Sequence, residues 1–382
     1  MGNSANPEIL IVGGGVIGLS LARELHRRGQ RRIAVVERGR VGHEASFAAA
    51  GMLAPNAENE RVDDFYRLCD ESRSMFPRFA EELLAETGID IELDRSGTLY
   101  AAFTEADSEH LGLRYSRQIA AGIPVERLSA AETLSAEPNV AANIRESLFF
   151  SNDWQVENRR LVAALRASLE ANGVAILENT AVECVTTKNG EVTGVAFKDG
   201  LIAAERVVLA TGAWTSFIKI GDDAMPFEVR PIRGQMISFG PRSRVVKRVV
   251  YSPRGYLVPR ADGRVLAGAT VEDVGFADQT TEEAIAGLKI TGSEIAPCLA
   301  DQQIVEKWSG LRPAVEDRLP VIGQVPGYTD LFVATAHFRN GILLTPITAR
   351  LLADLIVNGQ GSEYFAQFGA GRLFNMGSNA AA

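Results

Sequence analysis

Residues 8–38 read EILIVGGGVIGLSLARELHRRGQRRIAVVER, and this stretch decides the fold class. Its first residues, 8–12, are apolar and partly β-branched, which predicts a buried strand. From Val16 onward the apolar side chains recur at helical spacing, and Gly29 is a residue type that commonly ends a helix. Residues 33–37 are again apolar and predict a second strand. A helix that joins two strands in this way lays them parallel in one sheet, so we expect an α/β fold with a Rossmann-like unit.

The turn between the first strand and the helix carries Gly13, Gly15 and Gly18, in the spacing G-x-G-x-x-G. The first glycine permits a tight turn, the second lets the backbone approach a pyrophosphate, and the third lets helix and strand pack closely. The helix N-terminus adds N–H groups and a positive dipole end for phosphate. Glu37 ends the second strand, where its carboxylate can accept hydrogen bonds from ribose hydroxyls. We therefore predict a dinucleotide without a 2′-phosphate, rather than a purely structural glycine turn.

The bulk composition is that of a globular protein. Of the 382 residues, 46% are hydrophobic and 23% are charged, which suits one large domain or two intertwined ones. No apolar run reaches the roughly 18 residues of a membrane-spanning helix, and no signal-peptide pattern opens the chain. We therefore expect a cytoplasmic location without stable membrane insertion. The three cysteines are far apart and there are only four histidines, so neither a disulfide nor a metal site is predicted.

The charge distribution disfavours nucleic acid as a partner. The formal net charge is −9 and the sequence pI is about 5.2. The densest basic stretch, residues 26–32, lies at the predicted end of the first helix, where basic side chains complement the helix dipole. Without a larger basic surface, binding to a phosphate backbone is not expected.

The rest of the chain alternates between helical and strand-rich segments. Helices are predicted over residues 62–87, 158–173 and 281–296. Asn189-Gly190 and Asp199-Gly200 are hairpin turn signals in the middle of the chain. Residues 228–270 are rich in strand patterns, and no internal repeat or low-complexity linker is present. A nucleotide-binding start, a strand-rich insert and a helical end suggest two domains that share the chain discontinuously.

The glycine fingerprint alone does not decide between NAD and FAD. Residues 45–55, ASFAAAGMLAP, crowd small side chains just after the second strand, as expected where backbone lies against a flat ring. A tightly packed alanine-rich turn is the structural alternative. Residues 209–214, LATGAW, add a second strand end with a glycine, Gly212, at a position where such folds pass near the cofactor.

Together these motifs resemble the D-amino acid oxidase superfamily of FAD-dependent oxidoreductases, and within it the glycine oxidases of thiamine biosynthesis. The match runs from Glu8 to about residue 370. The motifs that carry it are IVGGGVIG, EASFAAAGMLAP, RVVLATGAW, GYLVPR, AGAT, WSGLRPAVEDRLPVIG and HFRNGILLTP. The resemblance implies an α/β, partly α+β architecture: a Rossmann-like FAD-binding domain and a discontinuous substrate domain built on an antiparallel sheet. We place the FAD-binding domain at residues 7–90, 155–225 and 305–372, and the substrate-binding domain at residues 91–154 and 226–304.

The resemblance also implies which residues hold FAD. Val16, Ile17, Glu37 and Arg38 would hold the ADP half, and the backbone of Val182 would contact the adenine end. The flavin side would be lined by Ala45, Ser46, Ala50, Gly51 and Met52. The pyrimidine edge of the flavin would be wrapped by His337, Phe338, Arg339, Asn340, Gly341, Ile342 and Leu343. No cysteine lies within SGLRPAVEDR, where some relatives carry a covalent flavin attachment, so FAD is expected to bind non-covalently.

The opening of the apolar segment HFRNGILLTPITARLLADLI, residues 337–356, is unusually polar. We expect a helix from about residue 341, with Pro346 in its first turn. The positive end of such a helix would face the anionic edge of a reduced flavin. A helix with an ordinary polar cap is the structural alternative, although arginine is a poor cap residue.

The substrate residues also follow from the resemblance. Arg312 in GLRP can pair bidentately with a carboxylate. Tyr256 would add a phenolic hydrogen bond to the same carboxylate, and Arg339 and Met52 would lie nearby. An arginine in a surface salt bridge and a tyrosine in the core are the structural alternatives. No catalytic acid or base is predicted, because oxidation by hydride transfer to flavin N5 needs mainly a neutral amine, an anchored carboxylate and an aimed α-C–H.

The implied activity is oxidative deamination of glycine, small amines or D-amino acids, with O2 as acceptor, an imine intermediate, and glyoxylate, ammonia and hydrogen peroxide as products. A D-amino acid dehydrogenase that passes electrons to a quinone is the main alternative. A tRNA-modifying flavoprotein is disfavoured by the net charge, and an inactive flavin-binding module is disfavoured by Arg312 and Tyr256. The family suggests a homotetramer. Val271 and Arg254 stand where the family more often has methionine and histidine, so the substrate preference is open.

Overall fold

The strand–helix–strand unit predicted from residues 8–38 is present in the computed structural model, which describes residues 6–59, 61–241 and 245–374. It consists of β1 (Ile9–Val12), α1 (Val16–Arg27) and β2 (Ile33–Val36). The two strands are parallel, with Ile9 beside Ile33. Gly29 follows the helix with a φ of +94°, a backbone conformation that glycine adopts without strain.

β1 and β2 belong to a six-stranded sheet. Its order is β19 (Val321–Gln324), β20 (Leu331–Thr335), β12 (Arg206–Leu209), β1, β2 and β8 (Ala175–Leu177). β19 pairs antiparallel with β20, and the other neighbours are parallel. This is the sheet of a nucleotide-binding fold, in which ligands bind beyond the carboxyl ends of the strands.

The alternating side chains of β1 explain the layers on the two faces of this sheet. Ile9 and Ile11 join a core with helices α1, α4 (Asp64–Thr87), α7 (Asn158–Ala171) and α9 (Thr345–Asn358). Leu10 and Val12 point the other way and pack beneath a four-stranded sheet. That sheet has the order β11 (Gly200–Ala203), β10 (Glu191–Phe197), β9 (Val182–Lys188) and β13 (Lys219–Ile220).

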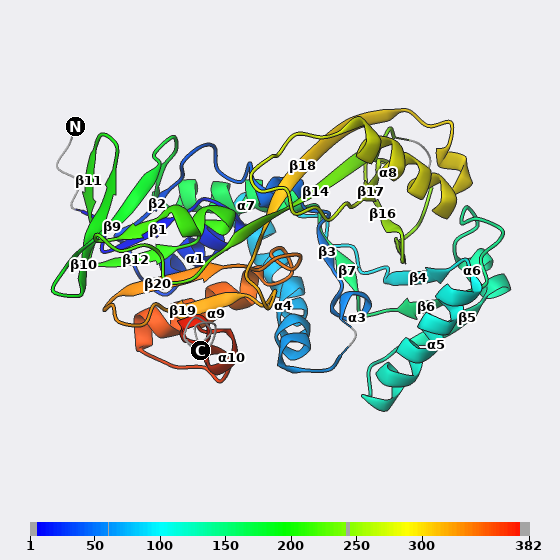
Figure 1. Cartoon of the computed structure of the whole chain (residues 1–382), viewed down its shortest axis with the longest axis horizontal. Helices are drawn as coiled ribbons and strands as arrows, with labels where there is room; N and C mark the ends of the chain where they lie inside the picture. The colour runs from blue at the N-terminus through cyan, green and yellow to red at the C-terminus, as the bar shows by residue number, and fades with distance from the viewer. Residues whose placement is uncertain (1–5, 60, 242–244, 375–382) are drawn as a thin grey trace, which may run out of the picture.

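The second half of the molecule is built on an eight-stranded sheet (Figure 1). Its order is β18 (Ile304–Ala314), β14 (Arg230–Phe239), β17 (Val265–Gly268), β16 (Gly255–Pro259), β15 (Val249–Ser252), β4 (Thr98–Ala102), β6 (Glu146–Phe150) and β5 (Glu126–Ser129). The expected antiparallel arrangement holds for its pairs with one exception among the described strands: β15 and β4 are parallel. A tight hairpin forces antiparallel pairing, whereas β15 and β4 come from distant parts of the chain, which permits a parallel pair.

One face of this sheet packs against α8 (Glu282–Ile295), and the other faces the nucleotide-binding half. The remaining elements are short or peripheral: α2 (Ala45–Ala48), β3 (Met52–Leu53), α3 (Pro55–Glu58), α5 (Glu105–Ala120), α6 (Ala130–Ala136), β7 (Trp154–Gln155), the 3-10 turns η1 (Gly212–Phe217) and η2 (Pro297–Leu299), α10 (Tyr364–Phe368) and α11 (Gly371–Phe374).

Most of the predicted elements are found close to their expected positions. Helices α4, α7 and α8 fall within the predicted ranges, and both glycine-containing turns lie in hairpins of the four-stranded sheet. The expected helix start at about residue 341 is wrong, because α9 begins at Thr345. Pro346 explains the difference: it has no N–H and a fixed φ, so it belongs in the first turn of a helix.

The division into two domains stays a prediction. The described strands of the six-stranded and four-stranded sheets lie in the segments assigned to FAD binding. β18 is a special case, since its pairing with β14 runs from Ile304 to Ala314 although most of it was placed in the FAD-binding segment. In Figure 1, β14 and β18 extend from one half of the molecule into the other.

Candidate active site

A cavity of about 610 Å³ lies between the two large sheets. On one side it is lined by residues at the carboxyl ends of β1, β2, β12 and β20, which is where nucleotide-binding sheets hold their ligands. On the other side it is lined by residues of β14, β16 and β18 from the eight-stranded sheet. Its volume lies within the roughly 300–1,000 Å³ typical of ligand pockets.

The glycine turn forms the part of the wall nearest to β1. A Cβ on Gly13 would lie 2.3 Å from the Ala210 carbonyl oxygen, and Gly13 has a φ of +114°, so only glycine fits there. α1 then begins at Val16 without a side-chain cap from Gly15 and without an acidic residue in its first turn. The Val16 N–H donates to the Ser46 hydroxyl oxygen at 3.1 Å, and this helix N-terminus at the cavity wall, together with the close backbone path, fits a pyrophosphate. The Glu37 carboxylate accepts hydrogen bonds from the Gly14 and Gly39 N–H groups at 2.8 and 3.0 Å, which fixes it at the cavity wall.

Arg38 and Trp214 lie beside this wall. The Arg38 guanidinium carbon is 3.6 Å from the centroid of the Trp214 ring, and Arg38 also pairs with Glu44. Trp214 comes from η1, directly after β12, and both side chains line the cavity. A cation stacked on an indole beside a helix N-terminus adds a positive charge where a phosphate is expected.

The segment after β20 closes the cavity from a third direction. Ala336 and Phe338 have positive φ values of 57° and 47°, which non-glycine residues rarely adopt. The turn is held by a hydrogen bond from the Phe338 N–H to the Pro313 carbonyl at 3.0 Å. His337 is buried, and burial lowers its pKa to about 3, so the ring is neutral. Its Nε2 lies 3.1 Å from the Thr348 hydroxyl oxygen.

Arg312 lines the substrate side of the cavity, on β18. Its Nη1 donates to the backbone carbonyls of Thr270 and Arg233, at 3.1 and 3.4 Å. Within the part of the chain that the structure describes, no carboxylate forms an ion pair with it. A Cβ on Gly234 would lie 2.2 Å from the guanidinium nitrogens, so this glycine makes the room in which Arg312 lies. Burial lowers the pKa of Arg312, yet an arginine stays charged at neutral pH.

Tyr256 and Tyr251 stand beside this arginine, on β16 and β15. Both are buried, their ring centroids are 5.4 Å apart, and burial raises the pKa of each phenol. Arg339 approaches from the loop after β20, where its Nη2 donates to the Tyr251 hydroxyl and lies 3.4 Å from Glu58 Oε1. The Glu58 carboxylate raises the pKa of Arg339 above its ordinary range. The substrate end thus holds one compensated arginine and one without a counter-charge among the described residues.

The structure brings almost all of the predicted site residues to this one cavity. Arg312, Tyr256, Arg339 and Met52, predicted for the substrate, line it. The residues predicted for FAD that line it are Gly13, Gly15, Val16, Ile17, Glu37, Arg38, Ala45, Ser46, Ala50, Gly51, Met52, Val182, Gly212, His337, Phe338, Arg339, Gly341 and Ile342. Their individual binding roles stay predictions.

Three predicted residues do not line the cavity. Gly18 packs against the carbonyl of Gly13, where a Cβ would lie 2.0 Å from the oxygen, so it serves helix packing. Leu343 is in the hydrophobic core, with its carbonyl accepting from the Ser72 hydroxyl at 2.6 Å. Asn340 uses its backbone to close the turn, accepting from Leu344 N–H at 2.8 Å. The backbone turns these two side chains away because residues 340–344 form a separate turn before α9.

Sequence reasoning missed several residues of the substrate end. Glu58 and Tyr251 line the cavity, and the missing side chain of Gly234 leaves the space that the Arg312 guanidinium occupies. Only the acidic side chain so soon after the alanine-rich segment could have drawn attention to Glu58. Of the two departures from the family pattern, Val271 lines the cavity and is 56% exposed. The Arg254 guanidinium instead reaches Glu294 of α8 at 3.5 Å, although the residue borders the cavity.

The fold and the cavity define a class of dinucleotide-binding enzyme in which a second sheet closes the ligand cavity. The model of the family of FAD-dependent oxidoreductases named DAO matches residues 8–355, and the chain belongs to this family. Glycine oxidase of Pseudomonas aeruginosa is 36% identical over 350 residues, covering 91% of this chain and 94% of the relative. The crystal structure of glycine oxidase from Geobacillus kaustophilus is similar with a TM-score of 0.89 and 32% identity, over 96% of this chain and 98% of that one.

A further relative is the bifunctional protein ThiO/ThiG of Trichormus variabilis, 36% identical over 365 residues. The match covers 94% of this chain and 54% of that protein. The protein is therefore an FAD-dependent oxidoreductase, and the glycine cradle and the start of α1 at the cavity wall fit that cofactor. None of its three cysteines lines the cavity, in agreement with non-covalent binding.

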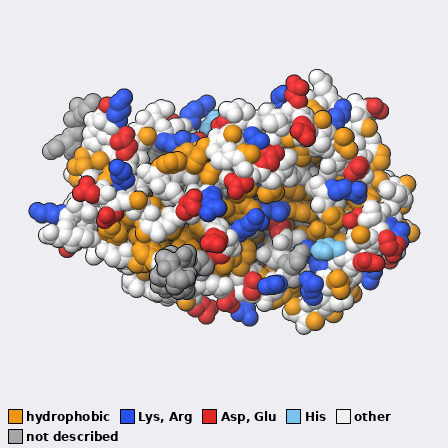
Figure 2. Space-filling model, viewed as in Figure 1, with side chains coloured by type: hydrophobic (Ala, Val, Ile, Leu, Met, Phe, Trp, Pro, Cys, Tyr) orange, Lys and Arg blue, Asp and Glu red, His pale blue; other side chains and the backbone are white. Residues whose placement is uncertain are grey.

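Two properties beyond the cavity complete the description. No helix in the described ranges combines the length and the hydropathy of a membrane span. The described residues also contain no group of three or more His, Cys, Asp or Glu side chains placed to hold a metal ion. Figure 2 shows basic and acidic side chains interspersed over one face of the molecule, rather than a continuous basic surface.

Proposed function

We propose that the protein oxidises glycine and other small amino acids or amines with FAD as cofactor. The reaction is glycine, O2 and water to glyoxylate, ammonia and hydrogen peroxide, through an imine. The observation that carries the proposal is Arg312: a guanidinium at the cavity wall, held by two backbone carbonyls, with no ion-pair partner among the described residues. A partly buried cation without an ion-pair partner favours binding of an anion, and the carboxylate of an amino acid supplies one.

The side chains of this site bind and orient rather than transfer protons. Arg312 pairs with the substrate carboxylate through the N–H groups that its backbone contacts leave available, and the Tyr256 hydroxyl donates to the same carboxylate. The raised pKa of Tyr256 keeps this phenol protonated, so it remains a donor at every pH near neutrality. Bound FAD supplies the two-electron acceptor. Fixing the carboxylate at two points leaves the α-carbon one orientation toward the cofactor, which is how positioning contributes to the rate.

The cavity walls limit the size of the substrate. Tyr251, Tyr256 and Met236 are buried around the end where Arg312 lies. These bulky side chains bound that end of the cavity, which favours small substrates such as glycine, sarcosine or D-alanine.

The deciding experiment is peroxide release in air from the holoenzyme with glycine, sarcosine, D-alanine, D-proline and L-alanine offered separately. Turnover of glycine and sarcosine with stoichiometric peroxide is the expected result. Flavin bleaching by D-amino acids under nitrogen without peroxide in air would instead identify a dehydrogenase. No bleaching with any of the five would contradict the proposed substrate class.

A further inference from the structure

Arg260 is the last residue of the GYLVPR segment, and the site described above leaves it without a role. It follows β16 directly and is only 4% exposed. Unlike the buried Arg23, which pairs closely with Glu86, it has no carboxylate within hydrogen-bond distance among the described residues. Glu157 Oε1 lies 3.9 Å from its Nε. Burying a charged group in this way is costly unless its N–H groups are well used.

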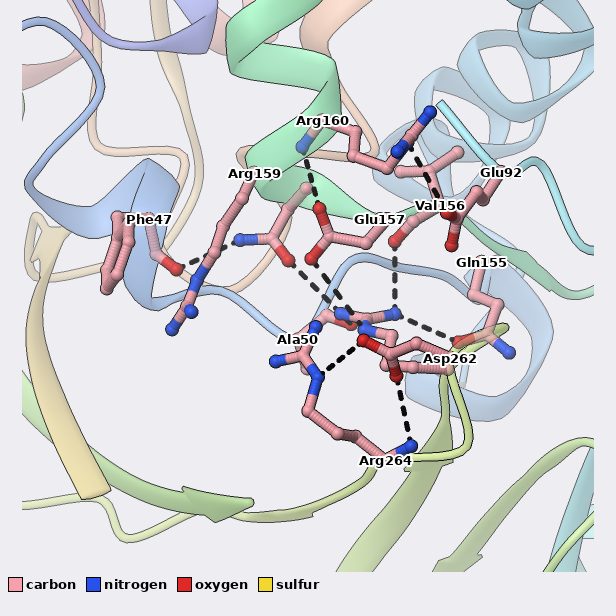
Figure 3. A network of polar contacts seen from close by, with 12 residues as sticks. Phe47, Ala50, Glu92, Gln155, Val156, Glu157, Arg159, Arg160, Asp262 and Arg264 are labelled. Carbon is pink, nitrogen blue, oxygen red and sulfur yellow. Dashed lines mark hydrogen bonds and ion pairs between the residues drawn. The ribbon is translucent and has the colours of Figure 1, made fainter. Parts of the chain in front are cut away.

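The Arg260 guanidinium donates instead to four neutral oxygens that come from two other parts of the chain. These are the Ala50 carbonyl at 2.9 Å, the Val156 carbonyl at 3.2 Å, the Gln155 side chain at 3.2 Å and the Asn158 side chain at 3.1 Å. Figure 3 shows this network, with Ala50, Gln155 and Val156 arranged around one guanidinium. Burial lowers the pKa of Arg260 to about 10, so it is protonated at neutral pH and can donate to all four.

Asn158 connects the Arg260 guanidinium to the segment that contains α2. Its Oδ1 accepts from Arg260, which leaves its Nδ2 to donate to the carbonyls of Ser46 and Phe47, at 2.8 and 3.0 Å. An asparagine amide has one acceptor side and one donor side, so the bond to Arg260 fixes its orientation. Arg260 thus holds residue 50 directly and residues 46 and 47 through Asn158.

The segment held in this way is a wall of the cavity. Ser46, Ala50 and Gly51 all line it, and the Ser46 hydroxyl accepts from the Val16 N–H at 3.1 Å, at the start of α1. Gly51 has a φ of +75°, and a Cβ there would lie 2.0 Å from the Val156 carbonyl oxygen. The backbone at Gly51 is therefore packed tightly against Val156, and Arg260 bonds to the carbonyls of both Val156 and Ala50, so it joins the two segments at this wall.

We propose that Arg260 is a positioning residue for FAD: through Ala50 and Asn158 it sets the place of the wall formed by residues 46–51. The fan of planar N–H donors suits four acceptors at once, which an ammonium group cannot match. The inference concerns the cofactor and does not depend on which amine is oxidised.

The test compares three variants as holoenzymes: Arg260→Met, Arg260→Lys and the control Arg23→Met. Arg23 is 3% exposed and links α1 to α4 outside the cavity, so its loss removes a comparable buried arginine. The readouts are the rate of FAD release on dilution and the visible flavin absorption spectrum. We expect Arg260→Met to release FAD at least tenfold faster than Arg23→Met, with a shifted spectrum, and Arg260→Lys to be intermediate.

A second variant covers the case in which Arg260→Met does not fold. Asn158→Asp keeps the volume and the acceptor for Arg260 but replaces the donor to Ser46 and Phe47 by an oxygen that repels their carbonyls. We expect a folded protein, because the new carboxylate pairs with Arg260, that still releases FAD faster than the wild type and has an altered flavin spectrum. Wild-type release and spectra in both Arg260→Lys and Asn158→Asp, or equal acceleration by Arg23→Met, would overturn the proposal.

Discussion

Arg312 and Arg339 carry the same charge at the same end of the cavity but differ in their surroundings. Arg339 has Glu58 as counter-charge, at 3.4 Å, and is 38% exposed. Arg312 donates to two backbone carbonyl oxygens and hydrogen-bonds to the Tyr256 phenol, and among the described residues no carboxylate forms an ion pair with it. Arg312, the arginine without an ion-pair partner, is therefore the one that we expect to bind the substrate carboxylate. Substitutions of Arg312 and Arg339 should for this reason affect substrate binding differently.

Replacing Arg312 with alanine should weaken substrate binding without releasing the cofactor. Two charge-assisted hydrogen bonds are lost, so we expect the KM for glycine to rise about a hundredfold or more, equivalent to ~3 kcal/mol. The flavin spectrum and the FAD content should stay as in the wild type. Arg350→Ala, which removes a half-exposed ion pair between α9 and Glu71 of α4, is the control, because Arg350 does not line the cavity. An unchanged KM in Arg312→Ala would remove this arginine from the substrate site.

Replacing Glu58 with glutamine should change the preferred substrate rather than abolish activity. Arg339 would then lose its counter-charge, and two cations would face the bound substrate. We expect the ratio of kcat/KM for iminodiacetate to that for sarcosine to rise about tenfold, because the two differ by one carboxylate and ~1.4 kcal/mol is a modest ion-pair contribution. The same ratio in both enzymes would mean that Glu58 has no part in selecting the charge of the substrate.

Among individual residues, the sequence predicts those that stand in recognisable motifs. It misses those that only the folding of the chain brings to the cavity. Arg312 and Tyr256 sit in GLRP and GYLVPR, and both line the cavity. Glu58 and Tyr251 sit in stretches without any special pattern, and they meet because α3 packs against β4, the strand that pairs with β15. Gly234 is of the same kind, because its importance depends on where the Arg312 side chain lies.

The loop between β20 and α9 is the element in which sequence and structure differ most. A helix was expected from about residue 341, whereas residues 340–344 form a separate turn and α9 begins at Thr345. The positive end of the helix is thus one turn farther along the chain than expected. The left-handed conformations of Ala336 and Phe338 could not be predicted, since neither is glycine or asparagine. They are imposed by tertiary contacts, which is typical of strained segments beside functional sites.

Gly341 and Gly234 allow the walls of the cavity to be tested separately. The only neighbour within 4 Å that a Cβ on Gly341 would meet among the described residues is His337 Cβ, at 3.8 Å, so Gly341→Ala should fold normally. We expect it to release FAD faster if the backbone approaches the flavin here. Gly234→Ala should instead displace Arg312 and raise the KM for glycine while FAD stays bound. The FAD release rate and the KM separate the two, and identical behaviour of both variants would contradict this assignment.

For the whole molecule, the sequence indicates that two domains share the chain discontinuously. It does not indicate which distant strands pair with each other. The glycine fingerprint locates the six-stranded sheet, and the hairpin signals locate the four-stranded one. The eight-stranded sheet gathers strands from residues 98 to 314, and nothing local specifies that β15 pairs with β4 or that β18 continues through the expected domain boundary. Such pairings depend on which apolar faces meet, and a single sequence read along the chain does not contain that information.

The buried His337 makes the stability of the whole chain depend on pH. Its folded pKa of about 3 lies below the ordinary value of 6.5, so below pH 6.5 the unfolded chain binds a proton that the folded chain does not. The contribution of this group is complete above pH 6.5 and is lost as the pH falls. Between pH 7 and pH 5.5 we expect the wild type to lose about 1 kcal/mol more than His337→Gln. Urea unfolding of both proteins with saturating FAD measures the difference, and parallel losses would mean that the ring is protonated in the folded state.

The long pairing of β14 with β18 has a mechanical consequence. The two strands are hydrogen-bonded from Arg230 and Ala314 to Phe239 and Ile304, and this ladder reaches from one half of the molecule into the other. A hinge between the halves would have to bend or break it, whereas domain closure elsewhere occurs about a few flexible residues. The paired strands therefore resist relative motion of the two halves and keep the two sides of the cavity at a constant separation. Ligands must therefore enter and leave the cavity through local movements of loops and side chains. The distance between the two walls of the cavity is fixed when the chain folds.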